Sequence, residues 1–421
     1  MKTRTIKVTD QVEATLTLPG SKSYTHRALI AAALAPGESI LANALKAEDT
    51  ELTTRALTML GAGLDWQGRT VQVRGAGGRL LPASASIFLG NSGTSMRFLT
   101  AVAALGQGVY RLTGTPRLCE RPMGELLTAL KDLGVRAISE QGNDCPPVVV
   151  QGGGFTGGHT SLSGAVSSQY LSALLLIGPL ASRGVVIDIT GELVSRPYVD
   201  ITLSVLTAFG ITYSREGYQF FELPGGQSYQ PRHYDIEADA SSASYFWAAA
   251  ALTRGRVTIT NLDLESVQGD IDFLSVLARM GCHLTSAPEG LTVEGGPLRG
   301  IHMDMSAMPD LVPTLGVLAA FAEGETVVSG VAHLRHKESN RLAAVVTELR
   351  KMGITAEETP DGLCIVGGVP QGAAIDTYDD HRIAMSFAVA GLKIPGVVVR
   401  DPGCVAKSFP DFWEYLEKLY S

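Results

Sequence analysis

The chain repeats itself at a nearly constant interval, and this repetition limits the folds that it can adopt. In five places an apolar-periodic segment ends in glycine, and an extended stretch follows that closes on a Gly-Gly or Gly-x-Gly pair. The five glycines are Gly61, Gly134, Gly210, Gly281 and Gly353, and their spacing is almost even. Glycine just after a helix commonly adopts a positive φ. We therefore expect each of the five to end a helix.

A second element repeats in step with the first. It is a small polar cluster that opens a helix rich in alanine and leucine, and its six copies begin near positions 21, 91, 167, 239, 310 and 380. This even spacing indicates six units, each of the same length as the interval between the glycines. The last unit keeps its helix at 412–419 but lacks the strands that should follow. We expect the N-terminal segments 5–8 and 13–18 to supply those strands.

Strands and helices alternate in each unit. Segments rich in β-branched residues predict strands at 148–150, 185–189, 257–260 and 397–399. The alternation predicts an α/β protein built from six similar units. No long polar linker divides the sequence, so composition alone places no domain boundary.

Composition excludes several classes of protein. The 421 residues are enough for two or three domains. Lys and Arg number 34 against 42 Asp and Glu, a net charge of −8, which argues against a general nucleic-acid binder. The longest apolar stretch, near Leu171–Leu180, is shorter than the ~20 residues of a membrane span. Five scattered cysteines without C-x-x-C spacing favour neither disulfides nor a zinc site, and we expect a soluble protein of the reducing cytoplasm.

Basic side chains gather at or near the predicted helix starts, where the helix dipole disfavours them. The eight residues are Lys22, Arg27, Arg97, Arg121, Arg196, Arg341, Arg382 and Lys407. Free backbone N–H groups together with a guanidinium or an ammonium group form a strong anion site. We therefore expect a small ligand that carries several negative charges.

Four carboxylates lie in the same segments. For Asp239 and Asp380 the simpler interpretation is helix capping or ion pairing. Asp310 precedes an apolar helix, and Glu338 lies in a charged run at 335–338. These two are candidates for acid–base chemistry, which their spacing alone does not establish.

Other motifs are incomplete. Residues 152–157 match G-x-G-x-x-G, but the residues that follow do not open a helix, so dinucleotide binding is not expected. Residues 19–23 are similar to the end of a P-loop but lack its leading glycine. His333 and His336 have no third ligand at a suitable spacing, so no metal site is expected.

Nine segments, in order along nearly the whole chain, match those of a known family. They are LPGSKS at 18–23 with Arg27, LGNSGTSMR at 89–97, ERP at 120–122, SSQ at 167–169, LVSRPYVDITL at 193–203, DASSASYF at 239–246, KESNR at 337–341, DDHR at 379–382 and AKSFPD at 406–411. On these segments the chain resembles the 5-enolpyruvylshikimate-3-phosphate synthases among the enolpyruvyl transferases.

The resemblance implies a two-lobed, inside-out α/β barrel of six repeated βαβαββ-like units. It implies that residues 1–18 and 237–421 form lobe one, that residues 19–236 form lobe two, and that the active site lies in the cleft between them. The implied reaction transfers the enolpyruvyl group of phosphoenolpyruvate to the 5-hydroxyl of shikimate 3-phosphate and releases phosphate, without a cofactor or an essential metal. The resemblance also implies a monomeric enzyme that acts in aromatic amino-acid biosynthesis and is a target of glyphosate.

The functional residues of the family are carried over one at a time. Those implied to contact shikimate 3-phosphate are Lys22, Ser23, Arg27, Ser167, Ser168, Ser195, Tyr198, Asp310, His333 and Lys337. Those implied to contact phosphoenolpyruvate are Lys22, Gly93, Arg121, Gln169, Arg341, Arg382 and Lys407. Asp310 is implied to help remove the hydroxyl proton and Glu338 to protonate the methylene carbon. Lys22 and His381 are further candidates for proton transfer.

Two positions depart from the family pattern, and two other functions stay open. His333 stands where the family usually has asparagine, and Phe98 replaces a usual proline. The nearest alternative is a UDP-N-acetylglucosamine enolpyruvyl transferase. Cys119 precedes Arg121 and suggests that enzyme, but the two residues are closer together than its pattern requires. The other is a non-catalytic anion-binding protein on the same scaffold, which would not need Asp310 or Glu338.

Overall fold

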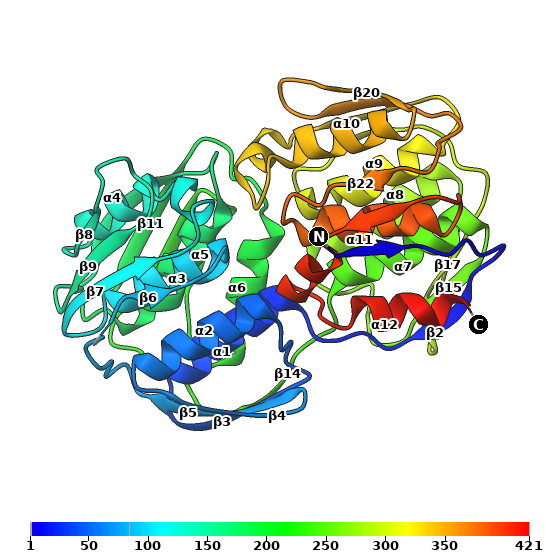
Figure 1. Cartoon of the computed structure of the whole chain (residues 1–421). Coiled ribbons are helices and arrows are strands. Elements are labelled where there is room, and N and C mark those ends of the chain that lie inside the picture. The colour runs from blue at the N-terminus through cyan, green and yellow to red at the C-terminus, as the bar shows by residue number, and fades with distance from the viewer. Residues whose placement is uncertain (1, 84, 421) are drawn as a thin grey trace. The chain divides into compact units, whose positions relative to one another are not determined.

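The chain folds into two compact units in a computed structural model that describes residues 2–83 and 85–420 (Figure 1). Unit 1 combines Met1–Leu18 with Ala238–Ser421, and unit 2 is Pro19–Glu237. Unit 2 is therefore an insertion in the sequence of unit 1. Glu237, which the sequence analysis assigned to lobe one, belongs to unit 2, where its carbonyl accepts a hydrogen bond from the Ser21 backbone N–H at 2.7 Å.

The described residues of unit 2 form three four-stranded sheets of identical topology. In each sheet a parallel pair of strands is followed by two antiparallel neighbours. The sheets, in strand order, are β14(His233–Asp235), β3(Pro36–Ala42), β5(Thr70–Ala76) and β4(Gly63–Gln67); β6(Ile87–Phe88), β7(Gly108–Thr113), β9(Val148–Gly152) and β8(Arg136–Ser139); and β10(Gly158–Ser163), β11(Val185–Thr190), β13(Phe220–Leu223) and β12(Ser214–Glu216).

Unit 1 repeats this topology over residues 2–18 and 238–420, except that its third sheet has three strands. Its sheets, in strand order, are β2(Glu13–Leu16), β15(Arg256–Ile259), β17(Gly290–Glu294) and β16(His283–Ala287); β18(His302–Asp304), β19(Glu325–Ser329), β21(Leu363–Val366) and β20(Thr355–Glu358); and β22(Ala374–Ile375), β23(Val398–Arg400) and β1(Thr3–Thr5). The six sheets correspond to the six units of the repeat.

The N-terminal strands were expected to complete the sixth unit together, and this is wrong for one of them. β1 does so, because it pairs antiparallel with β23, although it lies at Thr3–Thr5 rather than at 5–8. β2 instead pairs in parallel with β15. The edge of β15 is open to β2 because β14, the strand that precedes it in the sequence, pairs with β3 in unit 2.

The helices that begin at the polar clusters form the core of each unit. They are α1(Lys22–Leu34), α3(Gly93–Ala103) and α5(Ser168–Ile177) in unit 2, and α7(Ala240–Thr253), α9(Val312–Ala320) and α11(His381–Gly391) in unit 1. Every residue of α7, α9 and α11 is buried, and the three helices pack against one another. A helix that is apolar on all sides is stable only when all sides are covered. The helices therefore lie inside, and the sheets lie outside.

Each of the six repeats has a second helix, and five of these end where the glycines predicted. The six helices are α2(Glu48–Met59), α4(Gly124–Asp132), α6(Pro197–Ala208), α8(Phe273–Met280), α10(Arg341–Lys351) and α12(Phe412–Glu417). All five predicted glycines follow helix ends with φ between +79° and +112°, which confirms the prediction. Short 3-10 helices lie at η1(Leu118–Glu120), η2(Gly178–Leu180), η3(Gly269–Asp272), η4(Pro309–Leu311), η5(Ala332–His336), η6(Pro402–Lys407) and η7(Lys418–Tyr420).

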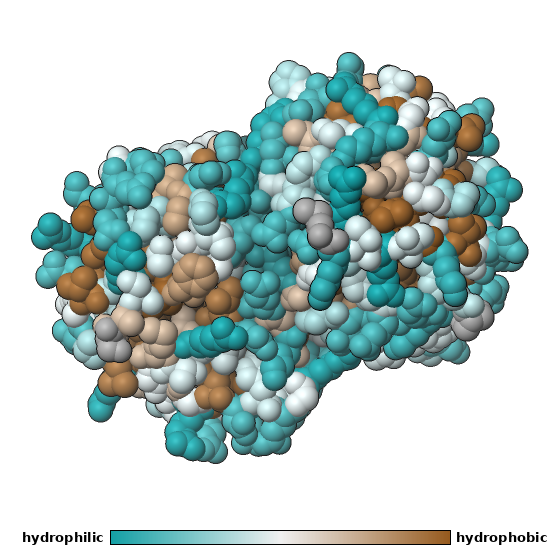
Figure 2. All heavy atoms as spheres, in the orientation of Figure 1, coloured by the Kyte–Doolittle hydropathy of each residue, from teal (hydrophilic) through white to brown (hydrophobic). Residues whose placement is uncertain are grey.

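Hydrophilic side chains predominate on the face of the molecule drawn in Figure 2, and apolar ones form small, scattered groups there. Over residues 2–83 and 85–420, no helix is long and apolar enough to cross a membrane.

Candidate functional site

Arg341 lies at the centre of an acidic cluster in unit 1. It is the first residue of α10 and is 1% exposed. Its Nε donates to Asp380 Oδ2 at 2.9 Å, its Nη1 to Asp310 Oδ1 at 2.8 Å and its Nη2 to Glu338 Oε2 at 2.8 Å. Burial acts to lower the pKa of Arg341, but the three carboxylates outweigh it and raise the pKa above its ordinary value. The guanidinium is therefore firmly charged.

Arg382, on α11, brings a second guanidinium to Asp310. Its Nη2 donates to Asp310 Oδ2 at 2.6 Å and to Ser241 Oγ at 3.4 Å, and its Nη1 donates to Tyr245 OH at 3.4 Å. Each oxygen of Asp310 thus accepts from a different arginine. Both arginines are nearly buried, since Arg382 is 5% exposed.

Asp380 and Asp239 serve as helix caps, as the sequence analysis favoured. Asp380 Oδ1 accepts from the Arg382 backbone N–H at 3.0 Å at the start of α11, and Asp239 Oδ1 accepts from the Ser242 backbone N–H at 2.7 Å at the start of α7. Asp380 also accepts from Ser339 Oγ at 2.9 Å. Capping therefore fixes the carboxylate that holds Arg341.

The other predicted residues of unit 1 lie on neighbouring segments. His381 is fully buried, with Nδ1 3.9 Å from Asp380 Oδ1. Lys407 is 5% exposed and is the last residue of η6, which packs on α11. The sequence analysis placed Lys407 near a helix start, but the next helix, α12, begins only at residue 412. His333 lies on η5, and Lys337 is the residue that ends it.

In unit 2, Gly93 leaves room for two guanidinium groups. It is the first residue of α3, and a Cβ at this position would lie 2.5 Å from both Arg121 Nη2 and Arg97 Nη1. Arg97 Nη1 donates to Gln169 Oε1 at 3.0 Å, and Arg121 Nη1 donates to the Asn91 carbonyl at 3.4 Å. The close approach explains why glycine stands here, and it brings three predicted residues together.

The remaining predicted residues of unit 2 lie at the starts of α1, α5 and α6. Lys22 begins α1, and its Nζ is 3.4 Å from Asp49 Oδ2 on α2. Ser167 caps α5 by accepting from the Gln169 backbone N–H at 3.3 Å, and Ser168 is the first residue of that helix. Ser195, with φ +55°, precedes α6, which contains Tyr198.

Arg27 is a buried hub of hydrogen bonds. Its Nε donates to Thr202 Oγ1 at 2.7 Å, its Nη1 to the Ser23 carbonyl at 2.9 Å and its Nη2 to the Tyr198 carbonyl at 3.0 Å. Its Cζ lies 5.0 Å from the centre of the Phe98 ring. Burial lowers the pKa of Arg27 to about 10. Arg27 thus ties α1 to α6, and Phe98 supports it.

Not every predicted cation belongs to an anion site. Arg196, at the start of α6, is 42% exposed at its side chain and pairs with Glu192 at 2.9 Å, four residues earlier. Such exposed pairs contribute little. For Arg196 the expectation of an anion site is therefore wrong.

Sequence reasoning missed Ser241 and Asp270. Asp270 is 5% exposed and accepts from Ser241 Oγ, which in turn accepts from Arg382. Burial, and then the nearby Asp310, raise the pKa of Asp270 to about 7. The repeat could have revealed Asp270, because it stands nearly one period before Glu338 in the sequence.

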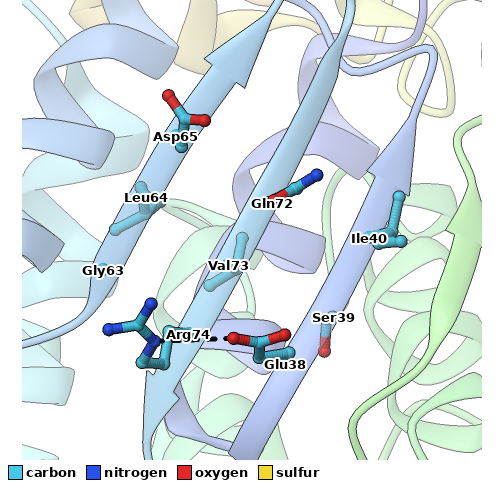
Figure 3. A pocket seen from close by; sticks show the side chains of 9 residues that line it. All are labelled: Glu38, Ser39, Ile40, Gly63, Leu64, Asp65, Gln72, Val73 and Arg74. Atoms are coloured by element: carbon cyan, nitrogen blue, oxygen red, sulfur yellow. Dashed lines mark ion pairs between the residues drawn. The ribbon is translucent and has the colours of Figure 1, made fainter.

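A hollow of about 490 Å³ lies on the outer face of the sheet formed by β3, β5 and β4 in unit 2 (Figure 3). Two of its charged side chains pair with each other, since Arg74 Nε is 3.6 Å from Glu38 Oε1, and both are largely exposed. The hollow includes none of the predicted site residues. In residues 2–83 and 85–420, no group of three or more His, Cys, Asp or Glu side chains is arranged to hold a metal ion.

The family model described as EPSP synthase (3-phosphoshikimate 1-carboxyvinyltransferase) matches residues 6–416. The chain belongs to the EPSP synthase family. A 3-phosphoshikimate 1-carboxyvinyltransferase of Trichormus variabilis is 46% identical over 411 residues, which cover 97% of this chain and 96% of the relative. One of Vibrio atlanticus is 44% identical over 427 residues and covers both chains completely.

Solved structures of the EPSP synthase family share the fold. An EPSP synthase of Acinetobacter baumannii superposes with a TM-score of 0.83 at 30% sequence identity, over 99% of this chain and 98% of that one. The predicted fold class, an α/β protein of six repeated units, is confirmed.

Proposed function

We propose that this chain catalyses the transfer of the enolpyruvyl group from phosphoenolpyruvate to the 5-hydroxyl of shikimate 3-phosphate, with release of phosphate, in the shikimate pathway. The observation that carries the proposal is Asp310 held between two nearly buried guanidinium groups, those of Arg341 and Arg382. The arginines suit an anionic substrate, and the carboxylate between them is placed to exchange a proton.

Phosphoenolpyruvate carries a carboxylate and a phosphate, and buried cations bind such groups through charge-assisted hydrogen bonds. We assign its binding to Lys22, Gly93, Arg121, Gln169, Arg341, Arg382 and Lys407. The room that Gly93 leaves beside Arg121 supports this assignment. The low exposure of Arg121 and Arg341, 4% and 1%, supports it further, because charge pairs are stronger away from water.

We assign shikimate 3-phosphate to Lys22, Ser23, Arg27, Ser167, Ser168, Ser195, Tyr198, Asp310, His333 and Lys337. The start of α5, beside Ser167 and Ser168, suits its phosphate because this end of the helix dipole is positive. The two substrate lists draw on residues of both units.

In the proposed reaction Asp310 takes the proton of the 5-hydroxyl as the oxygen attacks C2 of phosphoenolpyruvate. Glu338 gives a proton to C3, which becomes a methyl group, and a tetrahedral adduct forms. Loss of a C3 proton then restores the double bond while the C2–O bond to phosphate breaks. His381 and Lys22 are further candidates for these transfers. For Glu338 to carry that proton, its pairing with Arg341 has to weaken when the substrate binds, because a nearby cation favours the ionised carboxylate.

One assay tests the function. The purified protein is mixed with phosphoenolpyruvate and either shikimate 3-phosphate or UDP-N-acetylglucosamine, and phosphate release is followed. We expect release with shikimate 3-phosphate only. Release with the sugar nucleotide alone would establish the alternative transferase, and release with neither acceptor would favour a binding protein.

Gly93→Ala is expected to raise the KM for phosphoenolpyruvate by about 10- to 100-fold, as loss of one charge-assisted contact would. The added methyl group would displace the guanidiniums of Arg121 and Arg97, whose flexible ends can move without unfolding the protein. Steady-state kinetics check this. Gly63→Ala is the matched control, because its Cβ meets only Arg74, with Cβ at 3.4 Å. An unchanged KM would remove Arg121 from the site.

His333→Asn restores the residue usual in the family, and we expect it to keep shikimate 3-phosphate binding. Burial, and then Lys337, lower the pKa of His333 to about 3, against about 6.5 in an unfolded chain. The unfolded state therefore takes up a proton below pH 6.5 that the folded state refuses, and stability falls as the pH drops. As the pH falls from 7.5 to 5, the melting temperature of the variant should therefore rise relative to that of the parent protein. A pH-independent difference would contradict the burial of a neutral imidazole.

The expected partners are these two small molecules, with no nucleic acid, membrane or cofactor. The monomeric state and the cytoplasmic location stay predictions.

A further inference from the structure

Glu348 is a fully buried carboxylate on α10 that the proposed mechanism does not use. Its Oε1 accepts from Tyr378 OH at 2.6 Å, and its Oε2 accepts from the Asp376 backbone N–H at 3.1 Å. Lys351 Nζ donates to both oxygens, at 2.8 and 2.9 Å. A buried charge with this many partners fixes the groups that bind it. Glu348 thus holds the segment that leads from β22 to α11.

That segment adopts a strained backbone conformation. Tyr378 and Asp379 both have φ +54°, a left-handed conformation that a bulky residue such as tyrosine rarely adopts. Strain of this kind persists where the surroundings enforce it, and it often accompanies function. The next residue is Asp380, which holds Arg341 and caps α11.

Helix α10 binds this segment through two of its side chains. Arg341 begins α10 and pairs with Asp380, and Glu348 lies seven residues later, about two helical turns along the same face. α10 also packs against α11 itself. The contact between Glu348 and Tyr378 therefore holds the backbone two residues before Asp380.

We propose that Glu348 and Tyr378 are positioning residues that hold Asp380, and through it Arg341 and Arg382, in the geometry that binds phosphoenolpyruvate. This inference rests on the proposed function. The flanking ion pairs of Asp376 with Lys351 and Arg400 are between 34% and 45% exposed and contribute little. Tyr378 itself is 42% exposed, but its hydroxyl group donates to a carboxylate that is fully buried, and this part-buried bond is the link that the variants below test.

Tyr378→Phe removes only the hydroxyl group of this link. We expect the KM for phosphoenolpyruvate to rise by about three- to tenfold, as loss of one hydrogen bond would, with the KM for shikimate 3-phosphate and kcat within about twofold. Arg350→Ala is the matched control on the same helix, because Arg350 is exposed and bonds to the Ala356 carbonyl instead. It should lower the melting temperature slightly and leave both KM values unchanged.

Glu348→Gln and the double variant complete the test. If the hydroxyl acts through the carboxylate, the double variant has the same KM for phosphoenolpyruvate as Glu348→Gln alone, and its effects are not additive. Equal losses in both KM values and in kcat, or an unchanged KM for phosphoenolpyruvate, would overturn the proposal.

Calorimetric titration with phosphoenolpyruvate separates this inference from the proposed function. If the parent protein releases no phosphate with shikimate 3-phosphate, the proposed function fails. The dissociation constant for phosphoenolpyruvate then still compares the parent protein with Tyr378→Phe. A weaker constant in the variant supports the positioning role, and equal constants overturn it.

Discussion

Asp310→Asn is expected to lower kcat by about 10²- to 10⁴-fold, the range that general acid–base groups contribute. Asparagine keeps the shape of the side chain and one hydrogen-bonding oxygen, but it cannot take the hydroxyl proton. Without the charge of Asp310, Arg341 still pairs with Asp380 and Glu338, so we expect the variant to fold. Phosphate release measures kcat, and calorimetric titration measures shikimate 3-phosphate binding, which we expect to persist.

The control for this variant is Asp272→Asn, an exposed carboxylate of the same unit that makes no capping hydrogen bond to α8. It should retain full turnover. If Asp310→Asn instead weakened shikimate 3-phosphate binding as much as it lowered kcat, Asp310 would be a binding residue and the base would have to be sought among His381 and Lys22.

Arg341→Met is expected to destabilise the fold by about 3–5 kcal/mol, because a buried ion pair that loses one partner leaves the other charge uncompensated. Asp380 is 0% exposed and Glu338 9%, so neither carboxylate can turn to water instead. Urea unfolding of the two proteins at neutral pH measures the difference. The deficit should shrink toward pH 4, where protons neutralise the stranded carboxylates.

Arg350→Met is the comparison for this loss, since it removes an exposed guanidinium from the same helix. Its single bond to the Ala356 carbonyl predicts a cost of about 1 kcal/mol. If both variants lost the same free energy of unfolding, the stability of the acidic cluster would not depend on Arg341.

The repeat in the sequence predicted much of the fold, because helix ends have local causes. Gly61 and its four counterparts end helices through their own backbone, and five of the six polar clusters cap the helices that they precede, α9 being the exception. Strand partners have no such local signal. The sequence of β2 predicts a strand but does not indicate which sheet it joins. β2 lies beside β15 because β14, which is far away in the sequence, pairs with another strand.

The charges of the site residues made them predictable from the sequence, but the directions in which their side chains point were not predictable. Arg196 and Arg341 look alike in the sequence, yet one is exposed and the other sits among three carboxylates. The buried environment of Asp270 arises only when η3 packs against α7. Burial and orientation are set by tertiary packing, so spacing along the chain could not have distinguished these residues.

The pairing of β14 with β3, and of β1 with β23, also determines the order in which the two units can fold during synthesis. Unit 2 has all its strands once β14 has left the ribosome, so it can fold while the rest of the chain is still being made. β1 must wait for β23, which lies near the other end of the chain. β1 thus stays without its partner strand until most of unit 1 has been made, and unit 1 closes only after β23 has left the ribosome.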